Sequence, residues 1–489
     1  MEPPFQRLFK STLSLDRYPL GPGYLAAAVR QNTEWNVLVY NADFCGTSEQ
    51  LRVSYLAKEG FANYRDALDD RNHPVWGEVR RTIEEFGPRV AGISARSPNS
   101  ASAFRVAAIA KEVDPAITVL LGGPHASAVR NEALRVPAVD IVVRGEGERT
   151  LVEVLETIDG DRSLEGVLGI GYREGGRPVE NPPRELIEDL DLLPFPHEVA
   201  SAVLKDHDLH AVTAFRYIFS SRGCPFACSF CDSRTTWGRR VRFRSTENVM
   251  REIHGLREKG LRFVHFSDDT FGVNRKRLTE LCEALIDGGS GMMWGCETHA
   301  GLIDEKTVAL MKRAGCHSIE IGVESGNDDI LRKIRKETTI GQSLRALETI
   351  QKAGIETVGL FMVGFPDDTE ATLADTFSAM KNARCDRIHF SVFTPYPGSE
   401  SYEECRARGL IGEHHDPSLY GHQSPMNSFC ENVGPERFRE IVSAMEKMVD
   451  RRNSIGRLRS IFTGVGWRRM RELGPRGSVR KAVRFFTGV

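Results

Sequence analysis

The sequence predicts an α/β protein in which two series of strands and helices are followed by a helical region. Short runs rich in Val, Ile and Leu recur through the first 400 residues, and such runs are typical of buried strands. Helical patterns separate them, and this alternation predicts parallel sheets covered by helices on both faces. The chain has 489 residues, of which 40% are hydrophobic and 27% charged. That composition indicates a globular protein of about three domains.

The first series occupies residues 1–183. Its predicted strands are 35–40 (WNVLVY), 90–94 (VAGIS), 118–122 (TVLLG) and 139–143 (VDIVV), with helices over 75–86, 102–113 and 150–158. Two glycine-rich turns directly follow strands, namely Gly122-Gly123-Pro124-His125 and Gly145-Glu146-Gly147-Glu148. Both turns are therefore expected at the carboxyl edge of the sheet, where parallel sheets bind ligands.

The second series fills residues 206–408, after an acidic, proline-bearing linker at 184–205. Its predicted strands are 214–220, 263–267, 292–297, 318–323, 357–363 and 388–393. Six strand–helix units in this length fit an open, partial barrel better than a closed barrel of eight units. Residues 409–489 are predicted to form a helical C-terminal region.

Three cysteines lie close together just after the first strand of the second series. Cys224, Cys228 and Cys231 stand in SRGCPFACSFCDS, with the spacing C-x3-C-x2-C. Three thiolates on one loop suit a cubane iron–sulfur cluster, and three ligands for four irons leave one iron open. A zinc site is the alternative, but structural zinc prefers four ligands, and no neighbouring residue has a familiar spacing for the fourth. The remaining cysteines are expected to be small buried side chains.

The cysteine motif, with Phe230 as its aromatic residue, resembles the signature of the radical S-adenosylmethionine (SAM) superfamily. Further segments resemble successive strand ends of the partial barrel of that family: 237–253 (WGRRVRFRSTENVMREI), 266–274 (FSDDTFGVN), 310–331 (LMKRAGCHSIEIGVESGNDDIL), 359–369 (GLFMVGFPDDT) and 394–399 (TPYPGS). The resemblance implies that SAM chelates the open iron of a [4Fe-4S] cluster. It also implies that one electron from the reduced cluster cleaves SAM to methionine and a 5′-deoxyadenosyl radical.

The same resemblance assigns roles to individual residues. Cys224, Cys228 and Cys231 would be the cluster ligands, and Phe230 would pack near the adenine of SAM. The candidates for the wall of the cofactor site are Asp268, Glu324 and Ser325, at the ends of predicted strands. For Asp268 and Glu324 a second interpretation stays open, since a carboxylate in that position also caps a following helix.

The first series resembles the cobalamin-binding domain that precedes many radical SAM barrels. The matching segments are 18–30 (YPLGPGYLAAAVR), 120–127 (LLGGPHAS) and 142–150 (VVRGEGERT). The candidate cobalamin-binding residues are Ser94, Ser97, Gly122, Gly123, Ser127, Gly145, Glu146 and Gly147. The glycines let the backbone approach a large planar ligand, and the serines could bond to its amides or phosphate. The alternative is a structural Rossmann-like domain whose glycines only form tight turns.

One feature of other cobalamin proteins is absent. The D-x-H-x-x-G motif, which supplies a histidine to cobalt, does not occur, and Asp70 and His73 have the wrong spacing for it. We therefore expect cobalamin to bind without a protein imidazole below the metal.

These resemblances imply a cobalamin-dependent radical SAM enzyme that methylates an unactivated carbon of a small-molecule or biosynthetic intermediate. The deoxyadenosyl radical would abstract a hydrogen, and methylcobalamin would supply the methyl group. An external electron donor of the flavodoxin or ferredoxin type is implied. Two alternatives stay open: an oxidative cyclase or rearrangement enzyme resembling the Mg-protoporphyrin ester cyclases, and a non-catalytic cobalamin or redox sensor.

Charge and hydropathy limit the partners and the location. The net charge of −2 gives no indication of a nucleic-acid partner. No apolar run reaches the ~20 residues of a membrane helix, and the N-terminus lacks a signal-peptide pattern, so a cytoplasmic location is expected. Residues 451–489 carry eleven Arg or Lys against one acid, Glu472. This basic tail suits an anionic membrane, a phosphorylated substrate or another subunit, or it is a solvated helix.

Overall fold

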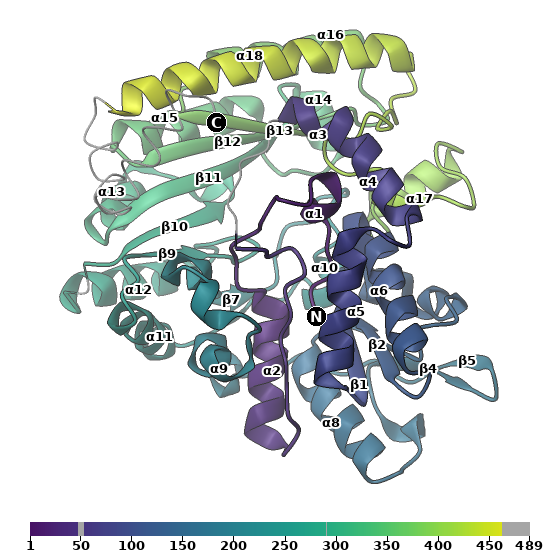
Figure 1. Ribbon diagram of the computed structural model, residues 1–489. Coiled ribbons are helices and arrows are strands. Elements are labelled where there is room, and N and C mark those ends of the chain that lie inside the picture. Colours follow the sequence, from purple (N-terminus) through teal and green to yellow (C-terminus); the bar gives the residue numbers. More distant parts are fainter. Residues whose placement is uncertain (47–52, 290, 462–489) are drawn as a thin grey trace. The chain divides into compact units, whose positions relative to one another are not determined.

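The computed structural model describes residues 1–46, 53–289 and 291–461, which form two compact units (Figure 1). Unit 1 comprises Met1–Asn248, Ile334–Lys336 and Val392–Phe429. Unit 2 comprises Val249–Lys333, Glu337–Ser391 and the described chain from Cys430 onward. Each unit therefore combines segments that are distant in the sequence.

Unit 1 contains a five-stranded sheet in the order β1-β2-β3-β4-β5. The strands are β1 Val90–Ser94, β2 Thr118–Gly122, β3 Ile141–Val143, β4 Ile170–Glu174 and β5 Arg177–Glu180. The first three are parallel, as predicted, while β4 and β5 pair antiparallel and make the sheet mixed. Gly175 and Gly176, both with positive φ, form the two-residue turn between β4 and β5, which is typical of a tight hairpin.

Helices cover both faces of this sheet. The helices of unit 1 are α1 Gln6–Phe9, α2 Leu20–Asn32, α3 Val53–Leu56, α4 Glu59–Asp69, α5 Pro74–Phe86, α6 Ser100–Val113, α7 Pro124–Val129, α8 Gly147–Asp159, α9 Pro196–Val203, α10 Arg234–Trp237 and α17 Glu400–Ala407. Successive residues of a strand point to opposite faces. Leu121 accordingly belongs to the core with α5 and α6, and Leu120 to the core with Val154 of α8. The predicted two-sided burial is confirmed.

The predicted strand at residues 35–40 is wrong. This segment forms only an isolated bridge, in which the Val39 N–H donates to Val203 O (2.7 Å) and Lys205 N–H donates to Val39 O (2.9 Å). Its partner in the bridge is Leu204, the residue just after α9. An apolar run indicates burial, but it does not ensure a strand partner.

Three short strands of unit 1 surround the cysteine motif. They are β6 Tyr217–Ile218, β7 Ser221–Arg222 and β8 Arg242–Phe243, and β7 pairs antiparallel with β8. The strand predicted over 214–220 is thus confined to two residues in β6, since a 3-10 turn occupies Val212–Phe215.

Unit 2 holds strands in the order β13-β12-β11-β10-β9. They are β9 Phe263–Phe266, β10 Met293–Thr298, β11 Cys316–Glu324, β12 Glu356–Val363 and β13 Arg387–Val392, with β9 to β12 parallel. The helices are α12 Arg275–Asp287, α13 Glu305–Arg313, α14 Asp328–Lys333, α15 Ile340–Lys352, α16 Glu370–Asn382 and α18 Pro435–Ile461, while α11 Thr246–Glu258 begins in unit 1. Strands β9 to β13 confirm the last five of the six strands predicted for the second series.

Helix α18 runs beside α16 and contains the start of the predicted basic tail (Figure 1). Arg452 donates to the carbonyl oxygens of Met380 (3.0 Å) and Lys381 (2.8 Å), so this cation serves the packing of unit 2. The rest of the tail, residues 462–489, lies outside the described residues. Across the part of the chain that is described, no helix has the length and apolar character to cross a membrane.

Candidate cofactor-binding site

The three cysteines of the motif lie on one loop of unit 1, between β7 and α10. Cys224, Cys228 and Cys231 are half-buried thiols. Gly223 precedes the first of them with φ +97°, and a Cβ there would lie 2.5 Å from Arg240 O. Only glycine fits both this backbone conformation and this close approach. The loop therefore begins at a point that the backbone just before β8 fixes sterically.

We call the segment between β7 and α10, residues 223–233, the cluster loop. Its middle is held by hydrogen bonds to two other segments of unit 1. The N–H of Ser229 donates to Ile334 O (2.9 Å), and the N–H of Ser401 donates to Ser229 O (2.9 Å). The Ser401 hydroxyl also donates to the Ser229 hydroxyl (3.0 Å). Both serines are buried. Ser229, one of the two residues between the second and third cysteines, is thus held by segments more than 100 residues away.

A carboxylate joins the end of this loop to the same two segments. Glu400 forms ion pairs with Arg234 of α10, with Arg239 and with Arg335. These groups are partly exposed, so each pair contributes little by itself. Together they hold three chain segments around one carboxylate.

One of the two cross-strand pairs between β7 and β8 consists of two arginines. Arg222 and Arg242 are cross-strand partners, and like charges in that position repel. Glu146 lies between them: its Oε1 accepts from Arg222 Nη1 and its Oε2 from Arg242 Nη1, each at 2.7 Å. Glu148 Oε1 accepts from Arg222 Nη2 at 2.6 Å. All four side chains are at most 7% exposed.

Further residues contact this group of two arginines and two glutamates. The guanidinium of Arg222 lies over the rings of Trp237 (4.7 Å) and Tyr24 (5.3 Å). Burial disfavours its charge, but the carboxylates of Glu148 and Glu146 outweigh burial and raise the pKa of Arg222. The Ile187 N–H donates to Glu146 Oε2 (2.6 Å). The acidic turn after β3 is thereby joined directly to the residue two positions before Cys224.

The donor set of the loop fits a cubane cluster. Three thiols on one loop can each bind a different iron, and thiolates are the ligands such clusters prefer. Among the described residues, no three His, Cys, Asp or Glu side chains converge on a single metal ion. Burial raises the pKa of the Asp232 carboxyl, next to Cys231. A cluster bound here would supply one electron to an external ligand at its open iron.

The predicted cobalamin-binding residues gather at the carboxyl ends of β1, β2 and β3. Gly123 has φ +93°, and a Cβ there would lie 2.7 Å from Ala95 O. The Ser127 hydroxyl donates to Gly123 O (3.1 Å) and accepts from the Gly145 N–H (3.0 Å), so it joins the two glycine turns. A Cβ at Gly122 would be in ordinary contact, 3.8 Å from Val143 Cβ. The hydroxyl of Ser127 thus ties the two turns together as one backbone edge.

The remaining predicted residues of this domain differ in what they offer. Ser94 is half-buried at the end of β1. Ser97 is buried, and its hydroxyl lies 3.1 Å from Nδ1 of the buried His125. Gly147 starts α8 against Leu25, and a Cβ there would lie 2.9 Å from it. The carboxylate of Glu146 is engaged by the two arginines, so its role toward cobalamin stays a prediction.

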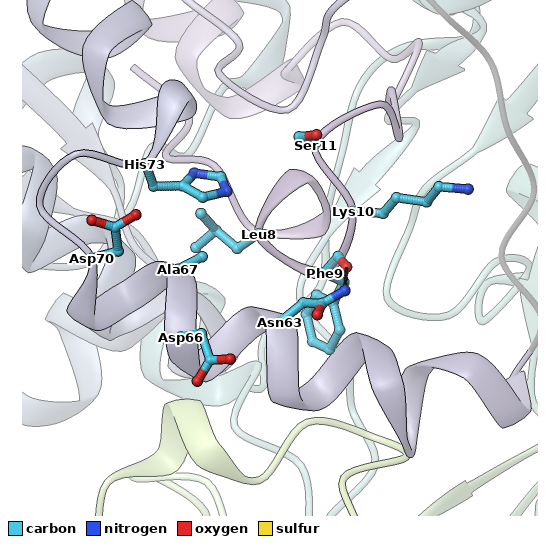
Figure 2. Close-up of a pocket in the computed structure, with 9 residues that line it drawn as sticks. All are labelled: Leu8, Phe9, Lys10, Ser11, Asn63, Asp66, Ala67, Asp70 and His73. Atoms are coloured by element: carbon cyan, nitrogen blue, oxygen red, sulfur yellow. Dashed lines mark hydrogen bonds between the residues drawn. The ribbon is translucent and has the colours of Figure 1, made fainter.

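Two histidines, His125 and His73, bear on the prediction that no protein imidazole lies below cobalt. Burial lowers the pKa of His125 to about 4, so the imidazole is neutral. His73 lies instead at the start of α5, beside a pocket of about 320 Å³ (Figure 2). The pocket is lined by Leu8, Phe9, Lys10, Ser11, Asn63, Asp66, Ala67, Asp70 and His73. None of the predicted site residues lines it.

Three predicted residues belong to unit 2, at the carboxyl ends of β9 and β11. Asp268 is buried just beyond β9. Glu324 is buried at the end of β11, at a register shift, with φ +64°. A non-glycine residue in that conformation is strained, which is a feature common at functional sites. Ser325 is 1% exposed, and its hydroxyl lies 3.3 Å from Thr376 Oγ1 and accepts from the Asn327 N–H (3.2 Å).

Comparisons with known proteins agree with this geometry. The Radical SAM superfamily matches residues 218–380, and the B12 binding domain matches residues 7–155. An uncharacterized methyltransferase of Pyrococcus horikoshii is 33% identical over 413 residues, which cover 84% of this chain and 83% of that protein.

The chain belongs to the cobalamin-binding radical SAM family.

As a cobalamin-binding radical SAM enzyme, it has a [4Fe-4S] cluster, SAM and cobalamin as its cofactors. The anaerobic magnesium-protoporphyrin IX monomethyl ester cyclase of Rubrivivax gelatinosus is 32% identical, covering 72% of this chain and 64% of the cyclase. A solved structure of the radical SAM methyltransferase TsrM from Kitasatospora setae, with tryptophan and a SAM analogue, has the same fold. It aligns with a TM-score of 0.64 at 16% identity and covers 89% of this chain and 87% of that one.

Several residues of this site were not predicted from the sequence. No role is predicted from the sequence for Arg222, Glu148, Glu400 or Ser401. The one available signal was the repeated acid in the Gly145–Glu148 turn together with the arginine that precedes Gly223. Which acid meets which arginine is not encoded in the spacing of either motif.

Proposed function

We propose that this enzyme transfers a methyl group to an unactivated carbon of a small-molecule or biosynthetic intermediate. One observation carries the proposal: the cluster loop and the glycine turns of the cobalamin domain lie in one unit and are joined by buried ion pairs. Such a connection suits a reaction that needs both cofactors at one substrate. The methyltransferase relative, which matches this chain over most of both lengths, supports methyl transfer as the outcome.

In this function, the residues of the chain would hold the cofactors and orient them. Cys224, Cys228 and Cys231 would hold the cluster, which supplies the electron that makes a carbon-centred radical from SAM. Methyl transfer to an aliphatic carbon needs such help, because that carbon offers no lone pair to attack the methyl group of SAM. The glycine turns after β2 and β3 would let the backbone approach cobalamin, and Ser94 would donate to its amides.

The test is the mass of the product. The reconstituted protein is incubated under anaerobic reducing conditions with SAM carrying a deuterated methyl group and a candidate substrate from neighbouring biosynthetic genes. The expected product carries one deuterated methyl group in place of one hydrogen of the substrate. A product that has lost hydrogens and gained no label would refute methylation. SAM cleavage to 5′-deoxyadenosine would separately exclude the non-catalytic sensor.

A second candidate is an oxidative cyclase or rearrangement enzyme. It is favoured by the similarity to the magnesium-protoporphyrin cyclase over 72% of this chain. The same mass measurement distinguishes the two, since cyclisation removes hydrogens from the substrate and adds no carbon.

An electron donor and a cellular location also belong to the proposal. We propose an external one-electron donor of the flavodoxin or ferredoxin type; reduced flavodoxin should then replace dithionite in supporting deoxyadenosine formation. We also propose a cytoplasmic location, which suits ten thiols in one chain.

We propose that the basic tail, residues 451–489, contacts an anionic membrane peripherally. Arginines interleave there with Trp467, Phe485 and Phe486, a composition typical of interfacial helices. The full-length chain should sediment with anionic vesicles, less so as salt rises. A chain ending at residue 450 that sediments equally would contradict this.

A further inference from the structure

The arginine pair of β7 and β8 creates an electrostatic problem at the base of the cluster loop. Two buried guanidiniums face each other across an antiparallel pair of only two residues per strand. Such a short ladder supplies little stability by itself. Removing the compensating acid would leave buried, unpaired charge, which is strongly destabilising. The ladder therefore depends on a carboxylate from elsewhere in the chain.

The carboxylates of Glu146 and Glu148 come from the cobalamin domain, the first strand–helix series at residues 1–183. Glu146 precedes α8 and Glu148 lies in its first turn, where the helix dipole favours negative charge. Glu146 bridges both arginines, and Glu148 binds Arg222 alone. Among the described residues, Arg242 finds its partners through Nη1, which donates to Glu146 Oε2 (2.7 Å) and to Ile187 O (2.6 Å). Each acid thus has a distinct share in the compensation.

The same region makes a second contact with the cluster loop. Helix α10, which follows the loop, packs on α7 of the cobalamin domain. At this contact Gly398 fits closely, since a Cβ there would lie 2.6 Å from Thr235 Cγ2 and 3.0 Å from Ala128 Cβ. The two ends of the cluster loop are therefore both held on the cobalamin domain.

We propose that Glu146 and Glu148 are positioning residues that hold the cluster loop and, through their charge next to Arg222, set the reduction potential of the cluster. Arg222 stands two residues before Cys224, which is at most ~7 Å of extended chain. The net charge of its surroundings is one of the factors that set the potential of an iron–sulfur cluster. With both acids present, two positive and two negative charges balance. The proposal rests on the cluster at the three cysteines and not on which carbon is methylated.

The test is an electron paramagnetic resonance redox titration of the reconstituted full-length enzyme carrying Glu148→Gln or Glu146→Gln. Each substitution leaves one positive charge uncompensated, which favours the reduced cluster and raises its potential. For a charge at roughly 12 Å and an effective dielectric constant of about 20, the reduction equilibrium changes about tenfold. For one electron this is about 59 mV.

Two further variants separate charge from loosening of the fold. Glu148→Asp keeps the charge and should restore the wild-type potential. Glu78→Gln is the matched control, because Glu78 pairs with the buried Arg7 (2.7 Å) on α1 and α5 and does not contact the cluster loop through any described bond. It should leave the potential unchanged.

The outcomes decide the proposal. A wild-type potential in both Gln variants, or an equal shift in Glu78→Gln, would overturn it. If Glu146→Gln retains no cluster by iron and sulfide analysis, Glu148→Gln carries the test, since it leaves the Glu146 bridge between the arginines intact. A failed methylation assay with shifted potentials would refute the proposed function and leave this inference standing.

Discussion

Replacing Gly223 by alanine should disturb the cluster loop more than any other single methyl group in this region. Gly223 has φ +97°, in the region that only glycine adopts easily, and its added Cβ would lie 2.5 Å from the carbonyl oxygen of Arg240. That oxygen belongs to the backbone, so it cannot move away as a flexible side chain could. Gly223 is followed directly by the first cluster ligand, Cys224.

The magnitude follows from two contributions. Placing a non-glycine residue at positive φ costs ~1–2 kcal/mol, and forcing an extra carbon into a close-packed contact typically costs ~1–3 kcal/mol. The sum is about 2–5 kcal/mol, against a total stability of ~5–15 kcal/mol for a typical domain. Because the strain is at the start of the loop, displacement of Cys224 is the expected way to relieve it. Cluster content should therefore fall more than secondary structure.

The control is Gly176→Ala in the β4–β5 hairpin. Gly176 has φ +82°, but a Cβ there would meet nothing within 4 Å, so only the conformational cost of ~1–2 kcal/mol applies. The assay compares iron and sulfide content after reconstitution, the visible absorbance of the cluster, and the thermal unfolding midpoint. If Gly223→Ala binds a full cluster and has the same thermal unfolding midpoint as Gly176→Ala, the steric reasoning is wrong.

Three further predictions follow from the site. Replacing each of Cys224, Cys228 and Cys231 by alanine should abolish the cluster absorbance and 5′-deoxyadenosine formation, whereas the buried Cys282 and Cys316 should be dispensable for both; cluster loss in Cys282→Ala or Cys316→Ala would contradict the ligand assignment. The cob(II)alamin-loaded protein should show an electron paramagnetic resonance spectrum without axial nitrogen splitting, and His125→Asn should leave that spectrum unchanged, because His125 is buried against Ser97; a nitrogen-split signal that His125→Asn removes would show the opposite. Stability should fall as the pH drops from about 6.5 to about 4, because burial lowers the pKa of His125 to about 4 and the unfolded chain therefore binds a proton first. The loss is about 3 kcal/mol, and denaturant unfolding of His125→Asn should show a smaller decrease over that pH range.

The sequence by itself identified the features that depend on residues close together in the chain. The cysteine spacing places three thiols on one loop, because a loop of eight residues cannot separate them widely. The glycine turns after β2 and β3 were likewise predicted, since positive φ favours glycine at Gly123 and Gly145, and Gly123 is also held close to Ala95 O. The order of strands and helices followed from hydrophobic periodicity. The predicted strand at 35–40 failed because burial was visible in the sequence and the strand partner was not.

Only the tertiary structure decided which distant residues meet. Glu146 bridges Arg222 and Arg242, which lie 76 and 96 residues further along the chain. Ser229 is clamped by Ser401, 172 residues away. Ser127, predicted to bind cobalamin, bonds to the backbone of both glycine turns. Periodicity shows which face of an element is buried, but a buried charge is stable only beside its partner, and that partner is chosen by packing of segments far apart in sequence.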